Sequence, residues 1–444
     1  MSTTFDLLLK GGTVVNHDGI GARDVGITAG KVAAIGSLEA SSAGEVIDCT
    51  GLHVLPGIID SQVHFREPGA THKEDLAAGS LGAVLGGVTA VFEMPNTKPL
   101  TITEDTINEK LSLAKGRMWC DHAFYVGATH HNAKELEELE LLPGVCGVKI
   151  FMGASTGDLL VHDDAGVRDV LSHGRRRVAI HSEDEEILRA NAGLAREGDW
   201  TSHPEVRSAE AARRCTERLL AIARETGRRI HVLHISTADE IPMLAANKDI
   251  ATAEITPQHL TLEGPEVYER LKGLAQMNPP VRDAHHRQGL WAALAAGVFD
   301  VMGSDHAPHT LEEKAKPYPA SPSGMPGVQT TVPLMLTYVN EGRLSLERFV
   351  DLMCHGPNRI FGIAGKGRLA VGYDADVTVV DLKAKRVITN DWMANVSGWT
   401  PFDGMEATGW PKGTIIRGQR VMWEDEVIGT SMGAPVKFQE TLGR

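Results

Sequence analysis

Hydrophobic and polar positions alternate regularly along the middle of the chain. Short apolar runs predict eight buried strands, at residues 57–64, 88–94, 123–127, 147–152, 178–181, 231–234, 251–255 and 298–303. Between most of them lie stretches with helical periodicity, for example at 73–85, 104–114 and 207–225. Eight strands alternating with helices over roughly 300 residues favour a closed parallel (β/α)8 TIM barrel over an open doubly wound sheet.

Both ends of the chain have a different pattern. Short Val- and Ile-rich runs separated by Gly and polar turns occur at 5–15, 24–35 and 45–49, and again at 368–381, 386–388 and 413–423. Neither group is long enough for a convincing sheet domain alone. We therefore expect one small β-sandwich domain built from residues 1–55 and 366–444, with the barrel formed by residues 56–365.

Polar side chains follow nearly every apolar run of the predicted barrel. A barrel gathers its strand ends around one mouth, so these side chains are expected to converge there. They are Gln62, His64 and Arg66 after the first strand, Asn96 after the second, Lys149 within the fourth, His181 on the fifth, His234 on the sixth, and Asp305 and His309 after the eighth.

Imidazole and carboxylate side chains at one mouth suit zinc and similar ions, and two ions can polarise a carbonyl together. Lys149 lies in an apolar run, where an unpaired ammonium is costly. It either pairs with a carboxylate or is carbamylated by carbon dioxide and bridges two metals. Asp305 either caps the next segment or acts as a proton shuttle.

Six other histidines have simpler interpretations. We expect His231, His259 and His306 to be structural, and His203, His285 and His286 to be solvated loop residues. The acidic run at 183–186 is interpreted as the first turn of a helix.

Composition narrows the possible partners. The net charge of −14 argues against a nucleic-acid or anionic-membrane surface. No apolar run approaches the length of a membrane span, and the five scattered cysteines indicate neither a disulfide framework nor a cysteine zinc site. A reducing, cytoplasmic location is the resulting expectation.

Five motifs carry a family resemblance: DSQVHFREPG, EMPNT, VLHIST, MNPPVRD and GSDHAPHT. With the order of strand-end residues, they resemble the amidohydrolase superfamily and, within its cyclic-amidase branch, the class I dihydroorotases. The resemblance covers essentially the whole chain. It implies reversible hydrolysis of L-dihydroorotate to N-carbamoyl-L-aspartate in pyrimidine (UMP) biosynthesis, with metal-bound hydroxide as the attacking group and Asp305 as proton shuttle.

The resemblance also assigns roles to the residues. The implied ligands of one or two Zn²⁺ ions are His64, Lys149 (carbamylated, bridging), His181, His234 and Asp305. The implied grip on the substrate carboxylate comes from Arg66, Asn96, His309 and Asn278, and the backbone at Gly324 and Gly327 is expected to approach the substrate. Relatives of this type suggest a homodimer.

One position departs from the family pattern. Gln62 stands where the family has a metal-binding histidine, and a carboxamide is the weaker ligand. Three outcomes are then possible: the site holds two metals, the site holds one metal, or the protein is a non-catalytic relative that assists a carbamoyltransferase. The other alternative is a different cyclic amidase, such as an allantoinase, hydantoinase or dihydropyrimidinase, although Arg66 and His309 argue against it.

Overall fold

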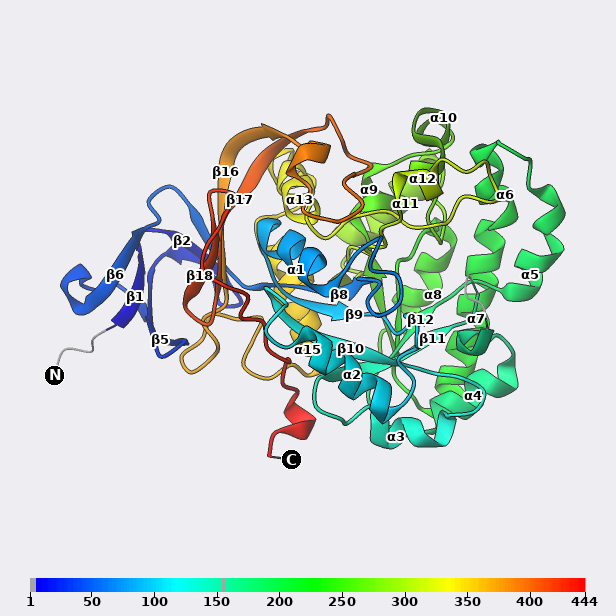
Figure 1. Ribbon diagram of the computed structural model, residues 1–444, viewed down its shortest axis with the longest axis horizontal. Helices are drawn as coiled ribbons and strands as arrows, with labels where there is room; N and C mark the ends of the chain where they lie inside the picture. Colours follow the sequence, from blue (N-terminus) through cyan, green and yellow to red (C-terminus); the bar gives the residue numbers. More distant parts are fainter. Residues whose placement is uncertain (1–4, 154–156, 444) are drawn as a thin grey trace.

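The computed structural model describes residues 5–153 and 157–443 and has a barrel with a sheet domain beside it (Figure 1). The barrel strands are all parallel and pair in sequence order, and a bridge between Val63 and His306 joins the last to the first. The predicted (β/α)8 fold is confirmed. Its strands are β8 (Ile58–Val63), β9 (Val88–Glu93), β10 (Asp121–Gly127), β11 (Val145–Phe151), β12 (Val178–His181), β13 (Ile230–Val232), β14 (Ala251–Ile255) and β15 (Val301–Met302).

Helices surround the strands on the outside of the barrel. Several begin at side-chain caps, as at Asp75, Thr103 and Ser208, whose oxygens accept a bond from a backbone N–H of the first turn. The helices are α1 (Leu76–Leu85), α2 (Glu104–Ala114), α3 (Leu136–Leu139), α4 (Asp164–Ser172), α5 (Glu185–Ala190), α6 (His203–Val206), α7 (Ala209–Thr226), α8 (Ile241–Ala246), α9 (Pro257–Thr261), α10 (Glu266–Leu271), α11 (Ala284–Ala295), α12 (Leu311–Lys314), α13 (Thr331–Asn340), α14 (Leu346–Val350) and α15 (Gly356–Phe361).

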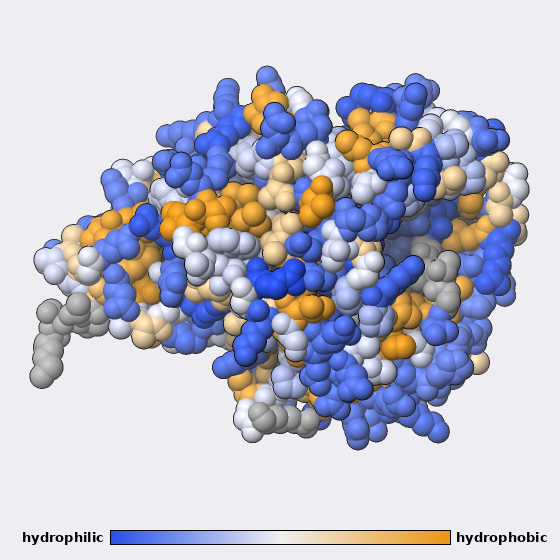
Figure 2. Space-filling view, in the orientation of Figure 1, coloured by the Kyte–Doolittle hydropathy of each residue, from blue (hydrophilic) through white to orange (hydrophobic). Residues whose placement is uncertain are grey.

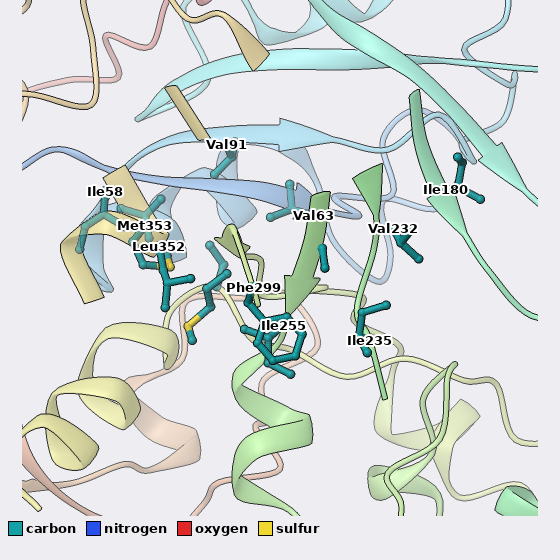
Figure 3. Packing of buried hydrophobic residues seen from close by; sticks show 14 of the residues in the cluster. Ile58, Val63, Val91, Ile180, Val232, Ile235, Ile255, Phe299, Leu352 and Met353 are labelled. Atoms are coloured by element: carbon teal, nitrogen blue, oxygen red, sulfur yellow. The ribbon is translucent and has the colours of Figure 1, made fainter. Parts of the chain in front are cut away.

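The main core lies between the strands and these helices. Strand residues such as Ile58, Val91 and Val232 are fully buried there, and Leu352 and Met353 pack beside them (Figure 3). Apolar side chains on both faces of the strands explain why the strands read as continuous hydrophobic runs in the sequence.

Both ends of the chain build the sheet domain, as expected, and its two sheets form a small β-sandwich around one core. One sheet has the order β5-β4-β1-β6, and the other has the order β19-β18-β17-β16-β7-β2-β3. The strands are β1 (Phe5–Lys10), β2 (Thr13–Asn16), β3 (Gly19–Ala22), β4 (Asp24–Thr28), β5 (Lys31–Gly36), β6 (Ala43–Asp48), β7 (His53–Pro56), β16 (Val377–Val387), β17 (Glu406–Ile416), β18 (Gln419–Trp423) and β19 (Glu426–Val427).

Some predicted strand boundaries were wrong. Residues 368–376 are not part of a strand, whereas the separately predicted run at 386–388 continues β16 almost to its end. β16 pairs with β17 at residues 377–381 and again, after a register shift, at 385–387. The second pairing continues the strand into a polar stretch that has no hydrophobic signal of its own.

A buried ion cluster joins the barrel to the sheet domain. The Lys366 ammonium donates to Asp121 Oδ2 at 2.6 Å and to Asp376 Oδ2 at 2.6 Å, and it lies 2.9 Å from Asp374 Oδ2. Asp121 starts β10 of the barrel, whereas Asp376 immediately precedes β16. Arg417 also pairs with Asp121. This cluster fixes the two parts of the molecule to each other.

The surface is mainly hydrophilic over the barrel helices on the face shown in Figure 2, and a hydrophobic band crosses the sheet domain. Within residues 5–153 and 157–443, no helix has the length and apolar character needed to cross a membrane.

Candidate active site

A cavity of about 90 Å³ opens at the carboxyl ends of the barrel strands. Its wall contains most of the polar residues that the sequence places at strand ends. The lining residues are Gln62, His64, Arg66, Asn96, Lys149, Phe151, His181, His234, Asn278, Asp305, Ala307, Ser323 and Gly324.

Three of these residues have left-handed backbone conformations that non-glycine residues rarely adopt. The φ angles are +59° at Arg66, +36° at His234 and +45° at Asp305. Each follows a barrel strand, where the chain turns from the sheet into a loop. Such conformations cost on the order of 1 kcal/mol or more, and they concentrate at sites where side-chain direction matters.

His64 and Asp305 face each other as two acceptors. His64 Nδ1 lies 2.8 Å from Asn96 Oδ1, so that nitrogen carries the proton. Its Nε2 lies 3.2 Å from Asp305 Oδ1. Burial lowers the pKa of His64 below its ordinary value, so the ring is neutral near pH 7 and Nε2 presents a lone pair to the carboxylate. A cation between His64 Nε2 and Asp305 Oδ1 would remove the repulsion between the lone pair and the carboxylate.

His181 and His234 lie next to each other in the same wall. His181 Nε2 donates to Glu183 Oε2 at 2.6 Å, which leaves Nδ1 as an acceptor 3.0 Å from His234 Nε2. Burial alone would raise the pKa of Glu183, but Arg207 and His181 lower it well below its ordinary value. A carboxylate that fixes an imidazole tautomer in this way is the usual support of a metal-binding histidine.

Lys149 lies on the wall of the cavity with a free amine. Its side chain is 1% exposed, Nζ lies 4.4 Å from the centre of the Phe151 ring, and it makes no hydrogen bond or ion pair with the described residues. Burial lowers the pKa of Lys149 to about 7, although Asp305 and Glu254 oppose this shift. A large fraction of the amine is therefore neutral, which is the form that reacts with carbon dioxide.

Gln62 contacts Asp305 directly. Its Nε2 donates to Asp305 Oδ1 at 2.9 Å, whereas its buried Oε1 has no hydrogen-bond partner among the described residues. Gln62 therefore orients the aspartate and offers one uncommitted oxygen. An amide oxygen of this kind can bind a cation, although more weakly than an imidazole.

Cationic and amide donors occupy another part of the wall. Arg66 Nε donates to Pro308 O at 3.2 Å, and Arg66 Nη2 lies 3.3 Å from His309 Nε2. Burial lowers the pKa of Arg66 to about 10, so the guanidinium is still charged at neutral pH. Asn278 also lines the cavity, and its Oδ1 lacks a partner within the described residues.

The two predicted glycines have different surroundings. Gly324 lines the cavity with φ +137°, and a Cβ there would come within 2.4 Å of Ala307 O. Gly327 is not in the cavity wall. Its N–H donates to His306 Nδ1, and a Cβ would meet Gln258 and Ser304. Gly327 therefore supports the loop from behind.

The structure corrects the interpretation of several other residues. His203 is not a solvated loop residue: it starts α6, is buried, and bonds Met277 O at 2.9 Å. His285 and His286 are at the surface but belong to helix α11. Within the acidic run, Glu185 and Glu186 form the first turn of α5 as expected and Asp184 caps it, whereas Glu183 is buried and contacts His181.

Sequence reasoning missed Glu183, although its position two residues after His181 was a usable signal. It also missed Ser323 and Lys314, which no periodicity marks, and Lys73, which it placed at the start of a predicted helix. The arrangement combines acceptors that suit a cation with donors that suit an anion. Such a cavity can hold a negatively charged substrate while water attacks a carbonyl.

Comparison with known proteins agrees with this chemistry. The sequence model of the amidohydrolase family matches residues 53–421. A dihydroorotase of Methanosarcina mazei is 35% identical over 99% of this chain and 98% of its own length. A dihydroorotase of Halobacterium salinarum is 36% identical over 94% of this chain and 96% of its own length.

Other cyclic amidases are also similar. An L-hydantoinase of Paenarthrobacter aurescens is 33% identical over 96% of this chain and 96% of its own length. Among solved structures, the L-hydantoinase (dihydropyrimidinase) from Arthrobacter aurescens superposes with a TM-score of 0.92 and 31% identity, covering 98% of this chain and 100% of that one.

Proposed function

Because the chain belongs to the amidohydrolase family, we propose that it is a dihydroorotase, which opens the ring of L-dihydroorotate reversibly to give N-carbamoyl-L-aspartate in pyrimidine biosynthesis. The observation that carries this choice is one cavity with the acceptor pair His64–Asp305, the adjacent imidazoles of His181 and His234 and, in the same wall, the charged Arg66 guanidinium.

These groups fit metal ions. Neutral His64 faces a carboxylate, a contact that a bound cation would satisfy, and His181 and His234 place two more imidazoles in the same wall. We propose that one or two Zn²⁺ ions are held by His64, His181, His234, Asp305 and Lys149, with Lys149 carbamylated. Zinc at this site would polarise the ring carbonyl and lower the pKa of water.

The protein groups then have defined tasks. Arg66 donates two parallel hydrogen bonds to the ring carboxylate, and His309, Asn96 and Asn278 complete the contact. This fixes the scissile amide toward Lys149 and the histidines. Asp305 takes a proton from the attacking water and returns it to the ring nitrogen as the C–N bond breaks. One water is added, and no other reactant is needed.

Gln62 does not remove this chemistry from the site. Its Nε2 holds Asp305 Oδ1, and its free Oε1 remains available to a cation. We expect weaker binding of one metal rather than an inactive protein. The alternative is a non-catalytic partner of a carbamoyltransferase, and the only feature that favours it is the glutamine at position 62 in place of a histidine.

The experiment is ultraviolet-monitored hydrolysis of L-dihydroorotate by the protein purified with its own metal, with metal content measured on the same sample. Allantoin, hydantoins and dihydrouracil serve as competing substrates. Turnover of dihydroorotate with one or two zinc ions per chain is expected. Turnover of hydantoins alone would identify a hydantoinase, and no turnover after zinc and bicarbonate loading would favour the non-catalytic alternative.

We further propose a homodimer in the cytoplasm that can associate with a carbamoyltransferase. The resemblance to class I dihydroorotases supports the assembly, and five buried cysteines without disulfides support a reducing location. Light scattering, with and without the carbamoyltransferase, tests both associations.

A further inference from the structure

Lys73 contacts His309, the histidine that lies beside Arg66. Lys73 lies just before α1, and its Nζ is 3.1 Å from His309 Nδ1 and 2.9 Å from Glu313 Oε1. An ammonium group can donate hydrogen bonds but has no lone pair with which to accept one. His309 Nδ1 must therefore be unprotonated when it contacts Lys73.

The other ring nitrogen has a neighbour of opposite character. His309 Nε2 lies 3.0 Å from Ser323 O, and a carbonyl oxygen can only accept. The proton of the neutral ring therefore belongs on Nε2. Burial and the cations Arg66, Lys73 and Lys314 hold the pKa of His309 far below its ordinary value, so the ring stays neutral. Two independent contacts thus select the same tautomer.

This tautomer leaves two donors facing each other. Arg66 Nη2 lies 3.3 Å from His309 Nε2, and both atoms carry protons. The single Nε2 proton is directed at Ser323 O, so the ring offers Arg66 no acceptor, and an anionic acceptor placed against Arg66 Nη2 would complete the arrangement. The two oxygens of a planar carboxylate match the terminal N–H groups of a guanidinium that the ring leaves free in this way.

Lys73 is itself held in place. Glu313, its ion-pair partner, belongs to α12 and closes a capping box with Thr310. The Lys73 side chain is only 16% exposed. Its ammonium is therefore fixed between the loop after β8 and the loop after β15, and both loops contribute to the cavity.

We propose that Lys73 is a positioning residue that sets the tautomer of His309 and thereby makes the site selective for rings that bear a carboxylate. This inference rests on the proposed function. Without the ammonium, the Glu313 carboxylate, whose Oε2 lies 3.7 Å from His309 Nδ1, would draw the proton to Nδ1 against the contact with Ser323 O. The Nε2 of His309 would then accept a bond from Arg66 and present a lone pair to the substrate carboxylate, which would lose one donor and gain a repulsion.

The test compares Lys73→Met and Lys73→Arg with the wild-type holoenzyme. Lys316→Met is the matched control, because Lys316 is an exposed lysine in the segment that carries Glu313, the ion-pair partner of Lys73. We would measure the Kd of orotate, a planar carboxylate analogue, and kcat and KM for L-dihydroorotate and for dihydrouracil, which lacks the carboxylate. Histidine ring ¹⁵N shifts, assigned with His309→Gln, report the tautomer.

We expect Lys73→Met to raise the Kd of orotate and the KM of dihydroorotate about tenfold, with kcat changed less than about twofold and dihydrouracil unaffected. Lys73→Arg should restore most of the affinity, and the His309 proton should leave Nε2 in the Met variant only. Orotate affinity equal to that of Lys316→Met, or an unchanged tautomer, would overturn the inference. A wild-type protein that neither binds orotate nor hydrolyses dihydroorotate would instead overturn the proposed function.

Discussion

At the scale of single residues, the site depends on side chains whose partners are incomplete. Lys149 has a buried amine without a partner among the described residues, and Gln62 has a buried amide oxygen in the same condition. Such groups are costly in a folded protein, and they are retained where a ligand supplies the missing partner.

Replacing Arg66 with lysine should weaken substrate binding. Lysine keeps the charge but loses the planar pair of donors. We expect the KM of L-dihydroorotate and the Kd of orotate to rise about 100-fold, as for lost charged hydrogen bonds of 1.5–3 kcal/mol. Arg189→Lys on the exposed face of α5 is the control. An unchanged KM would remove Arg66 from the carboxylate contact.

Replacing Lys149 with alanine should remove bound metal as well as activity. The proposed carbamate supplies an anionic ligand that alanine cannot provide. We expect metal content below half of the wild-type value by mass spectrometry, and partial recovery of turnover on adding a short carboxylic acid. Lys248→Met, at a lysine paired with Asp300 before the start of β15, should retain its metal. Full activity of Lys149→Ala without added acid would discard the carbamate.

At the scale of elements, the loops after the strands determine the shape of the cavity. The segment after β15 carries Ser323 and Gly324 into the wall. It is held by Lys314, which donates to three backbone carbonyls, Gln276 O at 3.0 Å, Pro322 O at 2.9 Å and Gly324 O at 2.7 Å. One buried side chain thus replaces the backbone pairing that a strand would provide.

Lys314→Met should therefore loosen this loop. The three carbonyls lose their donor, and each buried unsatisfied group costs about 1–3 kcal/mol. We expect faster proteolytic cleavage between residues 310 and 326 and about tenfold weaker orotate binding, whereas Lys316→Met should change neither. Wild-type cleavage rates and affinity in Lys314→Met would show that other contacts hold the loop.

At the scale of the whole molecule, the sheet domain and the barrel share the ion cluster around Lys366. Lys366→Met would leave Asp121, Asp374 and Asp376 without their buried cation, and breaking such a pair costs roughly 3–5 kcal/mol. We expect the Tm to fall by several degrees. Lys31→Met is the matched control, because Lys31 pairs with Asp374 at the surface, where such pairs contribute about 0–1 kcal/mol. Equal Tm values for the two variants would contradict this assignment.

The sequence by itself determined the barrel and its split sheet domain. Buried strands and amphipathic helices have characteristic spacings of apolar residues, and these spacings can be recognised along the chain without knowing which elements pack together. It also predicted that five residues lie at one mouth of the barrel, because parallel strands in a closed barrel end on the same side. These residues are His64, Lys149, His181, His234 and Asp305.

Only the tertiary structure decided which atoms face each other. The bonds from His181 to Glu183 and from Lys73 to His309 fix tautomers through contacts that no sequence period encodes. The burial of His203 and the position of Gly327 behind the cavity likewise depend on how loops pack, and loop packing is set by residues far apart in the chain.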